Sequence, residues 1–434
     1  MNARPLALLP LLLFLAMFIG SGLYYQAQSV DFAFYQISAP VAILPAIVLS
    51  ILLARGPLNE RIDTFIKGIG DNTIITMVLI YLLAGAFASV SKAIGGVDAT
   101  VTLGLSLVPQ SLVLPGLFVI TALIATAMGT SMGTIAAIAP IAVGLTEATE
   151  LPILLTIGTV VGGAMFGDNL SIISDTTIAA TRTQGCEMRD KFRMNLKIAT
   201  PAALLTLVLL YLQGGDGNVE QTGTIEWLKV APYLAVLVLA VSGLNVMLVL
   251  LLGILFAGMV GLSQIADYSV AQFAKDIYAG YSNMQEILIL SMLIGGLGAM
   301  MKQQDGLEFL AGLIGRLTRR KEGLPPSPRA GELSISTAVA LTNAATANNT
   351  VAIVISGSLA KDIATRYGVD PKRSASLMDI FSCVVQGLLP YGAQILLASS
   401  IAGLSPLKLV GSIHYCLLLG AMALGSILLT RRTG

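Results

Sequence analysis

The feature that most constrains this chain is its series of long apolar runs separated by short polar loops. A helix needs about 20 residues to cross the hydrocarbon core of a bilayer, and several runs approach or reach that length. Of the 434 residues, 55% are hydrophobic and 11% are charged, whereas soluble domains carry about 25% charged residues. Strands of a membrane barrel would alternate polar and apolar residues over about 10 positions. The sequence therefore predicts an all-α polytopic membrane protein.

The net charge, the cysteine spacing and the absence of certain motifs exclude several other classes of protein. The net charge of +1 offers no basic surface for nucleic acid. The three cysteines are scattered and form neither a disulfide framework nor a metal-binding spacing. There is no G-x-x-x-x-G-K-[ST] nucleotide loop and no H-E-x-x-H motif, and the single histidine is His414. We expect no enzyme and no cofactor, and we expect an ion gradient to supply the energy.

The apolar runs differ in length, which predicts two kinds of helix. We expect about 11 to 13 crossing helices, because a crossing takes about 20 residues. The first, near residues 5–24, is expected to be retained, since no cleavage pattern followed by a soluble domain appears. Shorter runs predict half-helices or re-entrant hairpins, which are tolerated only inside protein or beside a water-filled cavity. They are residues 98–108, 134–148, 170–181, 350–360 and 391–404.

Three blocks of sequence recur in the same order, which predicts an internal duplication. We expect two structural repeats, inverted relative to each other, each with a re-entrant hairpin and a broken helix, as in many secondary transporters. The expected organisation is N-terminal transmembrane helices (1–56), a first repeat (57–213), connecting helices (214–262) and a second repeat (263–434). The matching blocks are 72–95 with 283–306, 121–138 with 337–354, and 160–168 with 384–392.

Basic residues are concentrated in three loops, at 182–197, 316–329 and 361–373. Positively charged loops tend to lie in the cytoplasm. Residues 213–226 hold no Lys or Arg and are expected outside. Lys191 belongs to the first of these loops, and the alternative view is that all three are merely solvated turns.

Residues 158–183 hold polar groups within apolar sequence, around a break near Gly167. Ionisable residues at membrane depth are costly and indicate function. A carboxylate in a low dielectric favours its protonated form, and a neighbouring cation favours the charged form. One carboxylate can therefore bind sodium and protons in turn. Asp175 could instead cap a helix. The candidate site residues here are Asp168, Asn169, Ser171, Ser174, Asp175 and Thr176, with Asp168 and Asp175 as sodium ligands.

Each half also has a T-x-x-x-T segment, which is typical of an unwound hairpin tip. Its hydroxyl, amide and carbonyl oxygens are ligands that hard cations prefer. The alternative is that small and hydroxyl residues merely let helices approach closely. The candidates are Thr130, Thr134, Thr346, Asn348, Asn349 and Thr350.

The second copy has no acid to match Asp168, which falls opposite Gly392 in the alignment. We expect Pro390 and Gly392 to free backbone carbonyls there, with Gln386 and Gln394 as nearby polar side chains. Asp379 is a further acid that could be an intramembrane carboxylate.

The string GDNLSIISDTTIAAT (167–181) with its basic loop, the duplicated plan and LLPYG (388–392) resemble the NhaC-type sodium/proton antiporters. The resemblance covers roughly 60–430. It points to the polar residues of 168–176 and to Pro390, Tyr391 and Gly392. This chain departs from the family pattern at Ile172, where Pro is common, and at Tyr391, where Trp is common.

The resemblance implies a secondary transporter of the bacterial cytoplasmic (inner) membrane that exchanges sodium for protons. Its partners are the lipid bilayer, sodium and protons, and a homodimer by analogy. The alternative is a sodium- or proton-coupled carrier of a small organic solute, an amino acid or a carboxylate. A channel fits less well, because the two halves carry unequal acids.

Overall fold

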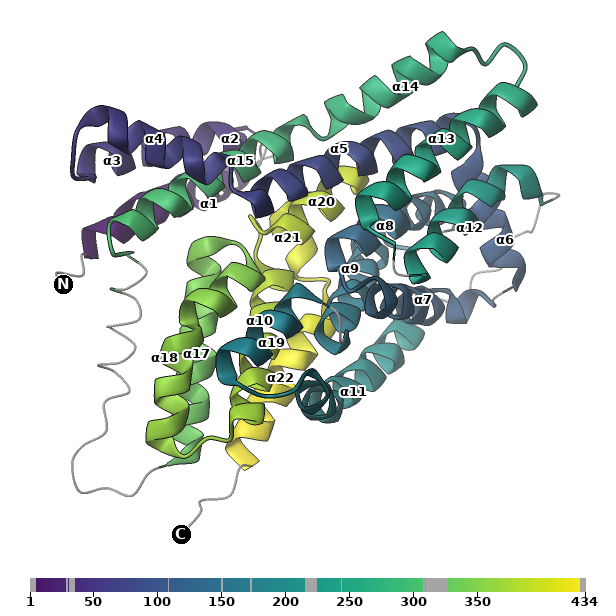
Figure 1. The fold of residues 1–434 in the computed structure, drawn as a ribbon. Coiled ribbons are helices and arrows are strands. Elements are labelled where there is room, and N and C mark those ends of the chain that lie inside the picture. Colours follow the sequence, from purple (N-terminus) through teal and green to yellow (C-terminus); the bar gives the residue numbers. More distant parts are fainter. Residues whose placement is uncertain are drawn as a thin grey trace.

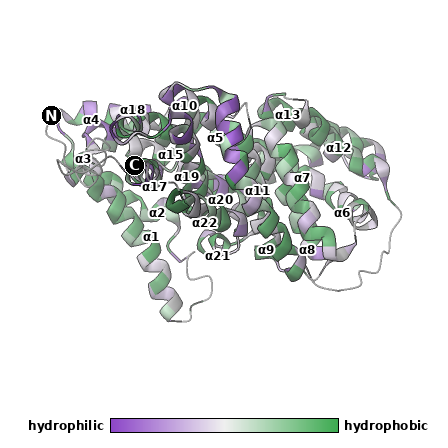
Figure 2. Cartoon of the chain, turned by 90° about the horizontal axis from the view of Figure 1, so that it is seen from below, coloured by the Kyte–Doolittle hydropathy of each residue, from purple (hydrophilic) through white to green (hydrophobic). Residues whose placement is uncertain are grey.

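The structure, a computed structural model, describes residues 5–28, 30, 36–107, 109–149, 151–171, 174–214, 225–242, 244–306, 309 and 327–429. Every regular element in these residues is a helix (Figure 1). Eight helical stretches of the described chain are long and apolar enough to cross a membrane, and four apolar helices of 10–17 residues accompany them. Hydrophobic residues dominate helices such as α9 and α13 (Figure 2). The prediction of an all-α polytopic membrane protein is confirmed.

The N-terminal helices lie beside α15, a helix from the second half of the chain. Helix α4 packs closely on α15 at Gly68, where an added Cβ would meet Ala299 at 2.5 Å and the Gly295 carbonyl at 2.7 Å. These elements are η1 (Pro5–Leu8), α1 (Leu9–Ala27), α2 (Ala39–Ala42), α3 (Leu44–Leu53) and α4 (Leu58–Ile69).

The first half then forms a hairpin of α7 and α8, followed by a helix broken between α9 and α10. The break lies where the apolar run gives way to Gly, Asp, Asn and Ser. The elements are α5 (Asn72–Ala93), α6 (Gly96–Leu107), η3 (Gln110–Leu112), α7 (Val113–Met128), α8 (Ser131–Ala148), α9 (Ile153–Leu170), α10 (Asp175–Gln184) and α11 (Met188–Gln213).

The second half has a similar hairpin, α17 with α18, and a second broken helix, α19 with α20. The connecting and second-half elements are α12 (Trp227–Val241), α13 (Val246–Gln264), α14 (Val270–Asn283), α15 (Gln285–Gln303), α17 (Pro328–Thr346), α18 (Asn349–Tyr367), α19 (Pro371–Leu388), α20 (Ala393–Ala402), α21 (Pro406–Val410) and α22 (His414–Leu429).

The two broken helices interlock the halves. Helix α10, from the first half, packs against α18 and α19 of the second half (Figure 1). Helix α20, from the second half, packs against α8 and α9 of the first. Each break therefore brings side chains of both halves to one place.

The predicted short segments appear as helices, with one clear difference in length. Helix α18 has 19 residues and continues well beyond the predicted 350–360. The prediction ended where the apolar run meets Lys361 and Asp362, but the helix continues through these charged residues to Tyr367. Residues 316–326 of the second basic loop and 215–224 of the predicted external loop lie outside the described residues.

Candidate functional site

Both hairpin tips turn through a left-handed residue and restart a helix with a polar cap. At the first tip Gly129 has φ of 68°, and Thr130 caps α8 by accepting from the Gly133 N–H. At the second tip Ala347 has φ of 51° and Asn348 caps α18 by accepting from the Val351 N–H. Capping side chains satisfy the free N–H groups at a helix start. The tips are thus ordered, and their polar residues are held in place.

The first broken helix is held by hydroxyl groups. Ser174 caps α10, because its hydroxyl accepts from the Thr177 N–H. The Ser174 hydroxyl also lies 3.2 Å from the Asp168 carbonyl, and the Thr177 hydroxyl donates to the Ser171 carbonyl at 2.6 Å. Asp175 is the first residue of α10 rather than its cap. Its carboxylate lies near the positive end of the helix dipole.

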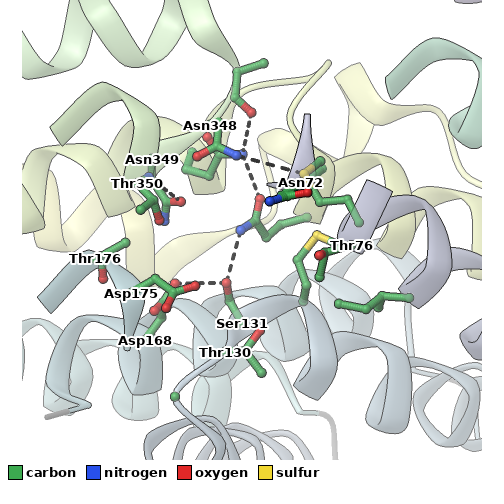
Figure 3. Close-up of a pocket in the computed structure, with 18 residues that line it drawn as sticks. Asn72, Thr76, Thr130, Ser131, Asp168, Asp175, Thr176, Asn348, Asn349 and Thr350 are labelled. Carbon is green, nitrogen blue, oxygen red and sulfur yellow. Dashed lines mark hydrogen bonds between the residues drawn. The ribbon is translucent and has the colours of Figure 1, made fainter. Parts of the chain in front are cut away.

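A cavity of about 290 Å³ lies between the tips and the breaks. Figure 3 shows its labelled side chains from α5, α8, α9, α10 and the second hairpin facing one space. Asp168 is 5% exposed in its wall, while Asp175 is exposed. The described residues that line it include these two acids and no Lys, Arg or His. The cavity is therefore suited to a cation.

A chain of hydrogen bonds crosses from the second half to Asp168. The Gln386 amide donates to the Gln394 side-chain oxygen at 2.7 Å. The Gln394 amide donates to the Ser131 hydroxyl at 3.0 Å, and Ser131 donates to the Asp168 carboxylate at 3.0 Å (Figure 3). All three donors point towards the carboxylate. The chain fixes the position of the Asp168 carboxylate and connects it to the second half of the protein.

The structure brings half of the predicted site residues to this cavity. They come from both tips and from the first break. The lining residues among the predictions are Asp168, Asp175, Thr176, Thr130, Asn348, Asn349 and Thr350. Ser131, Gln386, Gln394, Asn72 and Thr76 line it as well and were not in the predicted set. Of these five residues, the sequence provided a signal only for Gln386 and Gln394, which are polar and lie near the second break.

The other predicted residues are not among those that line the cavity. The hydroxyls of Thr134 and Thr346 donate to carbonyls of their own helix turn, those of Thr130 and Thr342. Gly392 is the N-cap residue of α20. The remaining members of this group are Asn169, Ser171, Ser174 and Pro390.

A second polar cluster lies behind the first break. It is built around Asp379, which sequence analysis considered as an intramembrane carboxylate, but its pairing with Lys191 was not predicted. Lys191 and Asp379 form an ion pair at 2.7 Å, and both side chains are 0% exposed. Asn169 and Asn195 each donate an amide N–H to the same Asp379 oxygen, at 2.9 and 2.8 Å. The alternative view of this segment as a merely solvated turn does not hold for Lys191, which is buried. Helix α11 starts at Met188, so Lys191 lies in its first turn and turns inward.

The sequence matches a family profile and several characterised proteins. Residues 4–214 match the Na⁺/H⁺ antiporter family. The chain is 27% identical to the Na⁺/H⁺ antiporter NhaC of Bacillus subtilis over 350 residues, which is 74% of this chain and 76% of that protein. It is 25% identical to the malate-2H⁺/Na⁺-lactate antiporter of the same organism, covering 79% of this chain and 78% of the relative.

A more distant relative is the arginine/ornithine antiporter ArcD of Halobacterium salinarum, at 21% identity over 82% of this chain and 80% of the relative. All three relatives are named as antiporters, and each match spans most of both chains. The profile match and these relatives show that the chain is similar to proteins of the Na⁺/H⁺ antiporter family over most of its length.

Proposed function

We propose that this protein is a secondary transporter that exchanges Na⁺ for protons at the cavity around Asp168 and Asp175. The observation that carries the proposal is the Asp168 carboxylate in the cavity wall, fixed by Ser131 and reached by a hydrogen-bond chain from the second half. A carboxylate in such a place can hold one cation or one proton. Binding of either excludes the other, which is the chemical requirement for exchange.

Oxygen atoms of both halves are available to complete a sodium site. Hard cations prefer carboxylate, hydroxyl and carbonyl oxygens. Asp175 and Thr176 stand at the start of α10, and Thr130, Asn348 and Thr350 stand at the two tips. A site shared between halves changes its ligand set when one half moves against the other, which is how alternating access is coupled to binding. We propose these residues as the sodium ligands, with Asn349 as a further candidate.

The experiment is ion exchange in proteoliposomes. Vesicles loaded with a pH-sensitive dye and acidified inside receive external NaCl, KCl, LiCl or choline chloride. The parent should alkalinise the lumen on sodium addition. Asp168→Asn should abolish the response and Asp175→Asn should weaken or abolish it, because each removes a carboxylate from the cavity.

The matched control is Asp63→Asn, which removes an exposed carboxylate on α4, outside this cavity. It should exchange like the parent. No sodium response in the parent, or a full response in Asp168→Asn, would contradict the proposed function.

The second candidate is coupled transport of a small organic solute. The cavity volume exceeds that of a bare ion, and two relatives are named for malate and lactate or for arginine and ornithine. The described lining offers two carboxylates and no cationic side chain, which disfavours a carboxylate substrate. Sodium-driven uptake of labelled lactate, malate or arginine without any sodium response in the dye assay would favour this candidate instead.

The proposed duplication has support in the helix boundaries. Corresponding landmarks of the two halves stand 218 residues apart: the left-handed tip residues Gly129 and Ala347, the helix ends Leu170 and Leu388, and the left-handed caps Gly185 and Gly403. In this register Asp168 is opposite Gln386 rather than Gly392. The sequence alignment followed small residues, which match by chance in membrane helices.

We also propose that the chain divides into four regions, with bounds at 56, 213 and 262, and that its two repeats are inverted relative to each other. We further propose that the protein lies in the bacterial inner membrane and forms a homodimer. Light scattering of the purified protein in detergent tests the dimer. A mass of one chain plus its detergent would contradict it.

A further inference from the structure

The ammonium of Lys191 is surrounded by oxygen atoms. It donates to the Asn169 carbonyl, the Thr177 hydroxyl and the Asp379 carboxylate, each at 2.7 Å. All three of its N–H groups are thereby used. The oxygens come from the end of α9, the first turn of α10 and the middle of α19. One fully buried cation thus joins three helices of both halves.

This oxygen set has the character of a monovalent cation site. Asn169 is close to the last residue of α9, and the carbonyl end of a helix carries partial negative charge. Asp379 adds a full negative charge. Carbonyl, hydroxyl and carboxylate oxygens together are the ligands of a hard cation. An unwound helix end facing a carboxylate is also a place where transporters bind coupling ions.

Spare oxygen atoms of the same cluster provide a second observation. The side-chain oxygens of Asn169 and Asn195 are buried and have no hydrogen-bond partner among the described residues. Buried acceptors are nearly always satisfied, so each unsatisfied one needs an explanation. Both asparagine amides donate to the Asp379 oxygen that also pairs with Lys191, so the two spare acceptors belong to the same buried cluster.

We propose that Lys191 acts as a tethered cation that fills a monovalent cation site in this fold. With the side chain shortened, the same oxygens would bind a free Na⁺ or a small alkylammonium ion. The proposal concerns a site behind the first break and is independent of the exchange proposed for the Asp168 cavity. It predicts that removing the Lys191 ammonium makes the protein bind a free cation in its place.

The test uses the full-length Lys191→Ala variant in detergent. Propylammonium matches the three carbons and the nitrogen that this substitution deletes. Thermal unfolding is compared in propylammonium, sodium and choline chloride at equal ionic strength. We expect propylammonium and sodium to raise the melting temperature of the variant by more than they raise that of the parent. Radioactive sodium should show about one additional bound ion per chain, as one vacated site requires.

Two further variants separate a cation site from a simple ion pair. Lys191→Met fills the space with an uncharged chain of similar length and should show no additional cation effect. Lys191→Ala combined with Asp379→Asn lacks the carboxylate and should lose the effect. If Lys191→Ala cannot be purified in choline, its yield of monodisperse protein is compared between propylammonium and choline during solubilisation.

Equal responses of Lys191→Ala, Lys191→Met and the parent to every cation would overturn the proposal. So would a response of Lys191→Ala that persists after Asp379→Asn is added. Failure of sodium exchange in proteoliposomes would leave this result untouched, because unfolding and binding are measured without transport.

Discussion

At the scale of single residues, Ser131 connects the two halves at the cavity, although neither a charge nor a sequence motif indicates this role. Its hydroxyl accepts from Gln394 and donates to Asp168, so it links the second broken helix to the carboxylate of the first. A hydrogen bond to a charged group contributes about 1.5–3 kcal/mol. The hydroxyl therefore has a measurable share in how Asp168 binds cations.

Ser131→Ala should raise the sodium concentration that gives half-maximal exchange by roughly tenfold or more, since 1.4 kcal/mol corresponds to about a factor of ten. The measurement is the sodium dependence of the proteoliposome signal. Ser336→Ala is the matched control, because the buried Ser336 hydroxyl donates only to the Glu332 carbonyl of its own helix. An unchanged sodium dependence in Ser131→Ala would contradict the role of this hydroxyl.

The residues that could be predicted from sequence are those whose polarity conflicts with their surroundings. Asp168, Asp175 and Asn348 stand within apolar runs, and the structure places all three at one cavity. Lys191 gave no such signal, because basic neighbours surround it and its partner Asp379 lies 188 residues away. Sequence alone reveals polar residues that stand within apolar runs. It does not reveal which polar residues of a loop become buried, because that depends on a partner from a distant part of the chain.

At the scale of elements, glycine sets how closely the broken helix is packed. Gly167 lies on α9 where that helix crosses α7, and a Cβ there would meet the Ala125 side chain and the backbone of Thr126. Small residues at such crossings let membrane helices approach closely. The break and its Asp168 are thereby held against the hairpin that carries Ser131.

Gly167→Ala should destabilise the protein, because overpacking a tight contact costs about 1–3 kcal/mol. It should also reduce exchange by displacing α9 from α7. Thermal unfolding and proteoliposome exchange are the measurements. Gly425→Ala on α22 is the control, since nothing lies within 4 Å of the added Cβ. Equal melting temperatures for the two variants would contradict the packing argument.

The elements themselves were predictable to different degrees. The breaks were located by Gly, Asn and Ser in apolar sequence, and the tips by their Thr and Asn residues. The alignment of one half on the other could not be predicted correctly. The reason is that Ala347 takes, at the second tip, the left-handed conformation that Gly129 takes at the first. An alanine gives no sign of that conformation in sequence.

At the scale of the whole molecule, the basic loops set the expected orientation. Basic residues lie on the helix ends that flank the turn between α10 and α11 and the turn between α18 and α19, which favours a cytoplasmic position for both turns. Examples are Arg182, Arg189, Arg366 and Lys372. Cys186 lies in the first of these turns and is partly exposed, while Cys383 and Cys416 are buried. The natural sequence therefore carries its own topology probe.

A membrane-impermeant maleimide should label Cys186 in inside-out vesicles and not in intact cells. Burial, followed by the nearby Asp190 and Asp370, raises the pKa of Cys186 to about 11. Since the thiolate is the reactive form, labelling should be slow at neutral pH and should accelerate as pH rises towards that value. Cys186→Ser is the control for labelling elsewhere. Labelling from the outside alone would reverse the proposed orientation.

The central claim is that sodium and protons share the Asp168 carboxylate. It is tested most directly by adding NaCl, or choline chloride as control, to weakly buffered purified protein near neutral pH with a pH indicator. The account predicts proton release on sodium addition from the parent and from Asp63→Asn, and little or none from Asp168→Asn. Equal proton release from Asp168→Asn and the parent, or none from the parent, would contradict it.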